Sequence, residues 1–376
     1  MKCKIWSKQL TVVTLMVIAV SFVQSCQNKT VQTQADVYGV LWSKSFINFG
    51  TQIIGFDVAK MEQVSEVSVA DKIGEVTKDK NYLWLSAPAG KNERFGKNVY
   101  RYNFQSMLLE KVIEVKGFAP NKIFLVNDLV FVSMYISDID IRPFNSSIEV
   151  YKINRDNDLS FVKSIYLDKG TRFKADLIST SPSKDYLYIA SWDLYNADTG
   201  EAPVLYVINT KTLEIESKLN LVEYFGASGG IAVNSDDVFI SVLQKYPGAP
   251  GKDAIEKIKD NRILVFDRRK LKLKNEIILS NHFPEQLIYN KARNHLYVLH
   301  NFRSTMAISI VDCSLQREIG VIDGIGDLSD MALADSNTLF VTSENDGKKR
   351  LISIDLNTHK IIKEFIGSYG ALSYQN

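Results

Sequence analysis

The sequence predicts an all-β fold, a seven-bladed β-propeller whose blades are four-stranded antiparallel sheets. Three observations support this prediction. One hairpin pattern recurs seven times along the 376 residues, the later copies are preceded by a second hairpin of the same kind, and the end of the chain matches a strand that the first copy lacks. Repeats at such a period, which bury their apolar faces only by packing side by side, are typical of propellers.

The recurring hairpin consists of two short apolar strands around a polar turn, as in "LISIDLNTHKIIKEF" (351–365). Successive copies lie 43–58 residues apart, which is close to the length of a propeller blade. Asp or Asn precedes most of the turns, and side chains of this kind can accept hydrogen bonds from the turn backbone. The positions before the turns are Asp57, Asn103, Lys152, Asn209, Asp267, Asp312 and Asp355.

A second hairpin precedes each later copy, for example in 230–243, 286–300 and 331–343. Two hairpins give a four-stranded blade, and strands rich in Val, Ile, Leu and aromatic residues with turns every 8–12 residues indicate an all-β protein. Closing the blades into a ring removes the free edges that an open array of sheets would leave.

The first blade lacks its innermost strand, because "VYGVLWS" (37–43) matches a second strand. The C-terminal "GALSYQN" (370–376) matches an innermost strand such as "GIAVNSD". We therefore expect Ala371–Gln375 to complete the first blade and close the ring.

Several strands resemble those of the YVTN-repeat family of seven-bladed propellers. The likeness lies in "LYVLH", "LFVTS" and "LYIAS", and in "ISIVDCSLQREI" and "ISIDLNTHKIIKEF". It covers residues 37–376, although the first three blades match loosely. The resemblance implies the fold but no single function, because similar propellers bind or catalyse quite different things.

Residues 1–25 resemble the signal peptide of a bacterial lipoprotein. Three lysines precede 14 uncharged residues, 10–23, fewer than the roughly 20 that span a bilayer. Cys26 follows a small residue and is the predicted lipidation site. Residues 26–36 are then the lipidated cysteine and a flexible tether to a membrane of the cell envelope, with the outer membrane preferred. A soluble secreted protein, cleaved nearby, is the alternative.

Charge and cysteine content exclude two classes of protein. The chain has 45 Lys and Arg against 43 Asp and Glu, and three of the lysines lie in the leader, so the mature protein is close to neutral. No basic patch or charged tail indicates nucleic-acid binding. Only Cys313 remains beyond Cys3 and Cys26, so no internal disulfide is possible. We expect a monomer stabilised by its apolar core.

Four neighbouring blades carry long loops between their second and third strands, all on one face. These loops are 87–97, 137–147, 193–202 and 245–261, the last with a possible short helix from Asp253. Function is often grafted onto loops of a rigid scaffold, although surface drift would also lengthen them. The candidate residues for binding a protein or glycan partner here are Arg94, Phe95, Tyr135, Trp192, Tyr195 and Tyr246.

The loops that join successive blades carry aromatic residues near the predicted channel mouth. They are Phe118, Phe173, Tyr224, Phe225, Phe283 and Tyr369, with Arg172 and His282 among them. Aromatic rims can stack on a sugar or a flat cofactor, or anchor a partner. The alternative is that they pack one blade against the next. Arg172, Phe173, Tyr224 and His282 are the preferred binding candidates.

Metal and catalytic motifs are weak. His295 and His300 face opposite sides of one predicted strand. Asp193 and Asp198 lie in one loop but lack the regular spacing of calcium ligands. We therefore predict no metal and no cofactor.

A catalytic site assembled from separate blades leaves no local motif. A lactonase-like or lyase-like enzyme therefore remains the alternative function. The loose candidates for its catalytic residues are Arg172, Glu223 and His282. The preferred function is a binding module, with an accessory role beside an outer-membrane transporter as one form of it, and a purely structural role is the third hypothesis.

Overall fold

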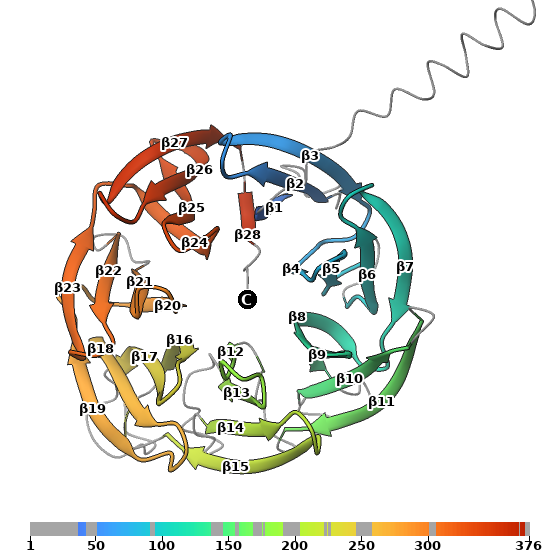
Figure 1. The fold of residues 1–376 in the computed structure, drawn as a ribbon, viewed down its shortest axis with the longest axis horizontal. Helices are drawn as coiled ribbons and strands as arrows, with labels where there is room; N and C mark the ends of the chain where they lie inside the picture. The colour runs from blue at the N-terminus through green and yellow to red at the C-terminus, as the bar shows by residue number, and fades with distance from the viewer. Residues whose placement is uncertain are drawn as a thin grey trace, which may run out of the picture.

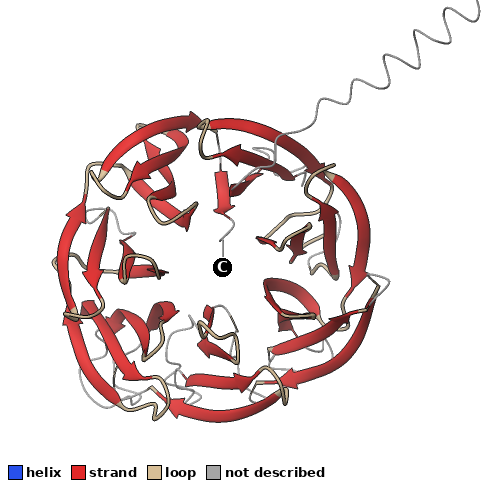
Figure 2. Ribbon diagram, viewed as in Figure 1, coloured by secondary structure: helices blue, strands red, loops and turns tan. Residues whose placement is uncertain are grey.

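A computed structural model of the chain describes most of residues 37–372. The described ranges are 37–42, 51–90, 95–136, 146–154, 158–167, 175, 177–190, 204–221, 224, 227–245, 258–300, 306–367 and 369–372. Every regular element in these ranges is a β-strand, as Figure 2 shows. In the same ranges no helix has the length and apolarity needed to cross a membrane.

The strands form four-stranded antiparallel sheets arranged around a centre like the blades of a propeller (Figure 1). The prediction of an all-β propeller with such blades is therefore confirmed. One blade contains β4 (Glu75–Lys78), β5 (Tyr82–Ala87), β6 (Asn98–Asn103) and β7 (Leu108–Glu114). The next contains β8 (Phe118–Val126), β9 (Leu129–Ile136), β10 (Ser147–Ile153) and β11 (Leu159–Tyr166). The third along the chain contains β12 (Leu177–Thr180), β13 (Tyr186–Ala190), β14 (Val204–Asn209) and β15 (Glu214–Asn220).

The second half of the chain repeats the arrangement. A blade follows with β16 (Ala227–Val233), β17 (Asp237–Lys245), β18 (Ile258–Asp267) and β19 (Leu273–Ile278). The next contains β20 (Pro284–Asn290), β21 (His295–His300), β22 (Ala307–Asp312) and β23 (Arg317–Ile322). The last contains β24 (Asp327–Leu333), β25 (Thr338–Asn345), β26 (Lys348–Asp355) and β27 (Lys360–Ile366).

The two ends of the described chain meet in one sheet. β28 (Tyr369–Leu372) pairs antiparallel with β1 (Val37–Trp42), and β2 (Thr51–Asp57) and β3 (Glu62–Val69) continue the sheet outward. The strand predicted at Ala371–Gln375 thus begins two residues earlier, and residues 373–376 lie outside the described part. Tyr369, expected in a loop, belongs to this strand because its partner is Leu41 of β1.

The predicted turn caps are present in six of the seven hairpins. Asp267 Oδ1, for example, accepts hydrogen bonds from the backbone N–H groups of Arg269 and Lys270, at 3.0 and 2.8 Å. These backbone donors favour the charged carboxylate and hold the pKa of Asp267 below its ordinary value. Lys152 is the exception, because its side chain has no acceptor. The capping residues are Asp57, Asn103, Asn209, Asp267, Asp312 and Asp355.

Each capped turn ends with a left-handed residue four positions after the cap. None of the six is glycine, and their φ angles lie between 49° and 58°. The residue four places on closes the turn by donating its N–H to the capping residue's carbonyl, as in Leu213 to Asn209 at 2.9 Å. The left-handed residues are Met61, Met107, Leu213, Leu271, Gln316 and His359.

The apolar core lies between neighbouring blades, where their flat faces stack. Second and third strands such as β14, β21 and β22 are almost wholly buried, whereas outermost strands such as β23 and β27 are mostly exposed or half-buried. Phe56 of β2 and Phe340 of β25 are both fully buried, with ring centroids 5.9 Å apart. Burial of such a side chain contributes about 1.5–3 kcal/mol, so each interface between blades is a substantial source of stability.

Candidate functional site

The innermost strands are irregular where they approach the ring axis. The pairing register shifts within β8, β16, β20 and β24, each shift marking a β-bulge or similar irregularity. Bulges re-aim side chains and are frequent beside active sites. Two non-glycine residues next to these irregularities, Ala119 and Phe283, have left-handed φ angles of 52° and 56°. Local strain of this kind concentrates at sites that the surrounding structure holds in place.

An ion pair joins two innermost strands on one side of the axis. Lys122 Nζ of β8 lies 2.5 Å from Glu75 Oε2 of β4. The Glu75 side chain is only 6% exposed, whereas that of Lys122 is 30% exposed. Burial raises the pKa of Glu75, and the Lys122 ammonium opposes this rise. A buried carboxylate with a perturbed pKa and a specific charge partner is a candidate functional group.

Two hydroxyl groups hold the backbone that presents Lys122. Ser133 Oγ of β9 accepts a hydrogen bond from Lys122 N–H at 2.9 Å. Ser86 Oγ, from the neighbouring blade, donates to the carbonyl O of Asn121 at 2.5 Å. Both serines are buried, so the irregular part of β8 is fixed from its own blade and from the next one.

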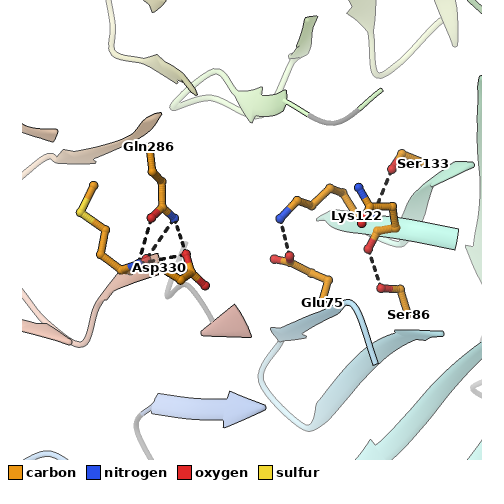
Figure 3. Close-up of polar contacts among 8 residues, drawn as sticks. Glu75, Ser86, Lys122, Ser133, Gln286 and Asp330 are labelled. Atoms are coloured by element: carbon orange, nitrogen blue, oxygen red, sulfur yellow. Dashed lines mark hydrogen bonds and ion pairs between the residues drawn. The ribbon is translucent and has the colours of Figure 1, made fainter. Parts of the chain in front are cut away.

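A second polar group lies across the ring, between β20 and β24. Gln286 Nε2 donates to Asp330 Oδ1 at 2.7 Å, and Gln286 Oε1 accepts from Met331 N–H at 2.9 Å. Thr342 Oγ1 contacts Ser329 Oγ at 2.6 Å behind this strand. Figure 3 shows the two groups on innermost strands that face each other across the centre.

Close backbone contact shapes a third part of the inner wall. A Cβ atom on Gly229 of β16 would lie 2.1 Å from the carbonyl O of Pro284, at the start of β20. Gly230 is equally constrained, since its Cβ would lie 2.8 Å from Leu287 N. Its N–H donates to Ser241 Oγ at 2.7 Å. Only glycine allows these two strands to approach so closely.

We use the name axial cluster for the four charged or amide residues of the two polar groups described above: Glu75, Lys122, Gln286 and Asp330. The blade-joining segments enter the innermost strands from the long-loop face, and Glu75 and Gln286 lie near those starts. The cluster contains the ammonium group of Lys122, which has three N–H donors, and the carboxylates of Glu75 and Asp330. It can therefore bind a polar ligand through charge and hydrogen bonds. Among the described residues, no group of three or more His, Cys, Asp and Glu could hold a metal ion.

Four of the predicted binding residues lie in the described part, in or next to four different blades. Phe95 and Tyr135 are half-buried, in different blades. Tyr224 packs edge-on against Phe266, with ring centroids 5.5 Å apart. His282 is exposed, but its carbonyl O lies 2.8 Å from His300 Nδ1. The other predicted residues lie outside the described residues: Cys26, Arg94, Arg172, Phe173, Trp192, Asp193, Tyr195, Asp198, Glu223, Phe225 and Tyr246.

Two of the aromatic residues expected at the channel mouth have packing roles. Phe283 is only 8% exposed, and Phe118 is half-buried at the start of β8 under the ammonium group of Lys97, 4.3 Å from the ring centroid. The packing alternative holds for these two rings. The long loop expected at 245–261 is also shorter, because β18 already begins at Ile258 and pairs there with Lys245. The helix expected from Asp253 lies outside the described residues.

The two histidines predicted to face opposite sides of one strand both lie in β21. His300 is fully buried and His295 is half-buried, at opposite ends of β21. His300 Nε2 lies 2.8 Å from Ser309 Oγ. Its Nδ1 faces a carbonyl oxygen and must therefore carry the proton, so Nε2 accepts from the serine hydroxyl. Because both side chains are buried, we interpret this pair as structural.

The axial cluster was missed in the sequence. Its residues stand in "EVTK", "PNKIF", "EQLIYN" and "LSDMAL", where charged or amide residues interrupt predicted innermost strands. Polar residues within these strands were the sequence feature that could have indicated the cluster. Whether such a residue faces the ring axis depends on the strand register, and a bulge shifts that register by one position.

Comparison with solved structures supports the fold. The chain is similar to the dihydro-heme d1 dehydrogenase NirN in complex with DHE, with a TM-score of 0.58 and 11% identity, over 92% of this chain and 76% of that one. It is also similar to a functionally unknown protein from Desulfotomaculum acetoxidans DSM 771, with a TM-score of 0.60 and 12% identity, over 89% of this chain and 98% of that one. No protein-family profile and no curated protein matches the sequence.

Proposed function

We propose that the protein is a lipid-anchored β-propeller of the bacterial envelope that acts as a binding module through its long-loop face. The observation that carries this proposal is the axial cluster. Its buried Glu75 pairs with the partly exposed Lys122, whose backbone is held by hydroxyl groups of two blades. A rigid scaffold with fixed polar groups beside long connections suits recognition of a polar partner, either a protein or a glycan.

The scaffold is proposed to be a closed ring of seven blades. The pairing of β28 with β1 supports closure, because it joins the two ends of the described chain. The interface between the β24–β27 blade and the β1–β3 sheet has an apolar core, as the other interfaces between blades do, with Phe56 and Phe340 in it. Closure makes the long-loop face rigid, which lowers the entropy lost when a partner binds.

Membrane attachment is proposed through a lipid on Cys26, on the outer membrane. The basic head, the apolar run and the small residue before Cys26 support it. Attachment by a lipid leaves the propeller outside the bilayer and its loops open to a partner.

An enzyme is the second candidate, favoured by one observation. Burial raises the pKa of Glu75, as expected for a carboxyl group that exchanges protons with a substrate. NirN, which has a similar fold, is a dihydro-heme d1 dehydrogenase, but at 11% identity this likeness extends to the fold alone. We therefore rank binding above catalysis.

The test is a pull-down of the full-length protein from its own membranes in mild detergent. In the test variant a four-residue turn replaces residues 246–257, which connect β17 to β18. The control variant changes the opposite face, by replacing Ser235 and Asp236 between β16 and β17 with Asn and Gly. Both variants keep every strand.

We expect a stoichiometric partner that is lost in the loop variant and retained in the control. Retention of the partner in both variants would show that the interface does not include this loop. If wild type and both variants emerge alone, protein recognition is wrong, and the axial cluster should be tested for a small polar ligand with Lys122→Met as the disabled variant.

A further inference from the structure

The antiparallel blades give the ring two different faces. In the described blades from β4 to β27, few residues separate the first strand from the second and the third from the fourth, and these strand ends lie on the side opposite the long loops. We call this side the turn face. It includes the capped turns that follow Asp267 and Asp312, and the turn between β20 and β21.

Basic residues gather on the turn face of the two neighbouring blades β16–β19 and β20–β23. The capped turn after Asp267 contains four of them within five positions, and the β20–β21 turn contains two more. The turns of these two blades also hold four acidic residues, Asp236, Asp237, Asp267 and Asp312. The basic residues are Arg268, Arg269, Lys270, Lys272, Lys291 and Arg293.

Six basic residues stand against four acidic residues in the turns of these two blades, so a net positive charge remains. Asp267 and Asp312 accept hydrogen bonds from backbone N–H groups of their own turns. Within the described part of the chain, no ion pair joins a carboxylate to Arg269, Lys270, Lys272 or Lys291, all of them exposed. Positive charge on rigid turns is therefore presented to whatever faces this side.

The N-terminal segment reaches the ring on the same face. In the β16–β19 blade the second strand begins at Asp237, which pairs with the capping residue Asp267. In the β1–β3 sheet the second strand begins at Val37, which pairs with Phe56, next to the capping residue Asp57. The start of β1 at Val37 is thus level with the turns.

The start of β1 and the basic turn after Asp267, between β18 and β19, lie on opposite sides of the ring centre (Figure 1). Figure 1 shows β1 at the upper right and β18 and β19 at the lower left. Ten residues, 27–36, separate Cys26 from β1, and such a segment spans at most about 33–36 Å. A ring held near one edge can tilt, and a second contact across the ring removes that freedom.

We infer that the turn face rests on anionic phospholipid headgroups of the leaflet that holds the lipid of Cys26. This inference depends on the anchor in the proposed function. The tether brings the turn face to the membrane, and the basic turns of the two blades hold it there by charge. The long-loop face then points away from the membrane, where a partner can reach it.

The test measures which face of the full-length protein lies against vesicles. One fluorophore is placed on the turn face through Ala292→Cys and, in a separate protein, on the long-loop face through Asn345→Cys; both native residues are exposed. Cys313 stays unlabelled because it is buried, and burial raises the pKa of its thiol to about 12. The vesicles contain phosphatidylcholine with or without phosphatidylglycerol, and a spin label on a headgroup quenches fluorescence.

We expect the turn-face probe to be quenched more strongly than the long-loop probe, and only with phosphatidylglycerol. The difference should disappear at about 1 M salt, where the Debye length falls to about 3 Å. It should also disappear in the triple variant Arg269→Gln, Lys270→Gln, Lys272→Gln. The matched control, Lys348→Gln with Lys349→Gln on the long-loop face, should keep it.

The outcomes separate this inference from the anchor. Protein that floats with all vesicles but shows equal quenching of the two probes, or stronger quenching of the long-loop probe, overturns the inference and leaves the anchor standing. Protein that does not float with any vesicle overturns both. Protein that floats only with phosphatidylglycerol, with its turn face quenched, supports the orientation and overturns the anchor.

Discussion

The ammonium group of Lys363 donates a hydrogen bond to the carbonyl O of Met61, which precedes it by 302 residues. Met61 is the left-handed residue of the first capped turn. The same contact occurs between neighbouring blades elsewhere, where Lys163 Nζ donates to the carbonyl O of Leu213 at 3.0 Å. The last and first sheets along the chain are thus joined as two consecutive blades are.

Loss of this contact should weaken the junction of the two chain ends. We expect Lys363→Met to lower the free energy of unfolding by about 1 kcal/mol, the usual net value of one hydrogen bond. Lys360→Met is the matched control, since it removes an exposed lysine from the same strand. Urea unfolding followed by tryptophan fluorescence measures both. Equal effects of the two substitutions would show that the contact adds nothing.

The left-handed turn residues allow a sharper test. His359 is exposed and has a φ angle of 57°, where a β-branched side chain is strained. His359→Val should therefore destabilise the protein by about 1–2 kcal/mol, whereas His359→Gly should leave stability unchanged or raise it by up to about 1 kcal/mol. Thermal unfolding of the two variants gives the comparison. A valine variant as stable as the glycine variant would contradict the turn geometry.

The sequence was informative wherever structure depends on local spacing. The turn caps at Asp57, Asn209 and Asp267 were predicted correctly because an Asx side chain bonds to a backbone only two or three residues away. The left-handed position was not found, because Leu213 and His359 occupy it without the glycine that usually marks such a site.

The axial cluster could not be predicted because its geometry depends on contacts between blades. The register of β16 is shifted where Gly229 touches the carbonyl of Pro284 in the next blade, and such a contact leaves no periodic pattern. Lys122 likewise faces Glu75 only because β8 is irregular beside it. In both places a residue's partner is set by a neighbouring sheet.

Buried His300 predicts a specific dependence of stability on pH. Burial is the main cause that lowers the pKa of the His300 imidazole, and the charge of His282 lowers it further. The hydrogen bond to the His282 carbonyl and the charge of Glu318 raise this pKa, but by less. Below the ordinary value of 6.5, the unfolded chain binds a proton that the folded protein does not. The free energy of unfolding should therefore fall as pH drops from about 7.5 to 5.

The variant His300→Leu with Ser309→Ala removes both partners of the buried pair and should show a shallower dependence on pH than wild type. Urea unfolding at several pH values measures the two slopes. Ser309→Ala alone is the control, because it keeps the imidazole. Identical slopes in wild type and the double variant would assign the effect to other groups.

The ion pair of the axial cluster predicts the opposite dependence on pH. Lys122→Met leaves the Glu75 carboxylate buried without its cation, which should cost about 3–5 kcal/mol near pH 8. Because burial already raises the pKa of Glu75, protonation relieves this cost, and the variant should regain stability as the pH falls toward the range in which Glu75 takes up a proton. Urea unfolding between pH 8 and 5 measures this recovery.

The double variant Glu75→Gln with Lys122→Met provides the matched control. It has no buried carboxylate, so it should be more stable than Lys122→Met at pH 8 and should lack the recovery in acid. If the single variant loses stability equally at every pH, Glu75 contributes no buried charge, and the packing of the Lys122 methylenes accounts for the loss. Recovery confined to the single variant would instead show that a charged carboxylate is maintained beside the ring axis, where the proposed ligand would meet it.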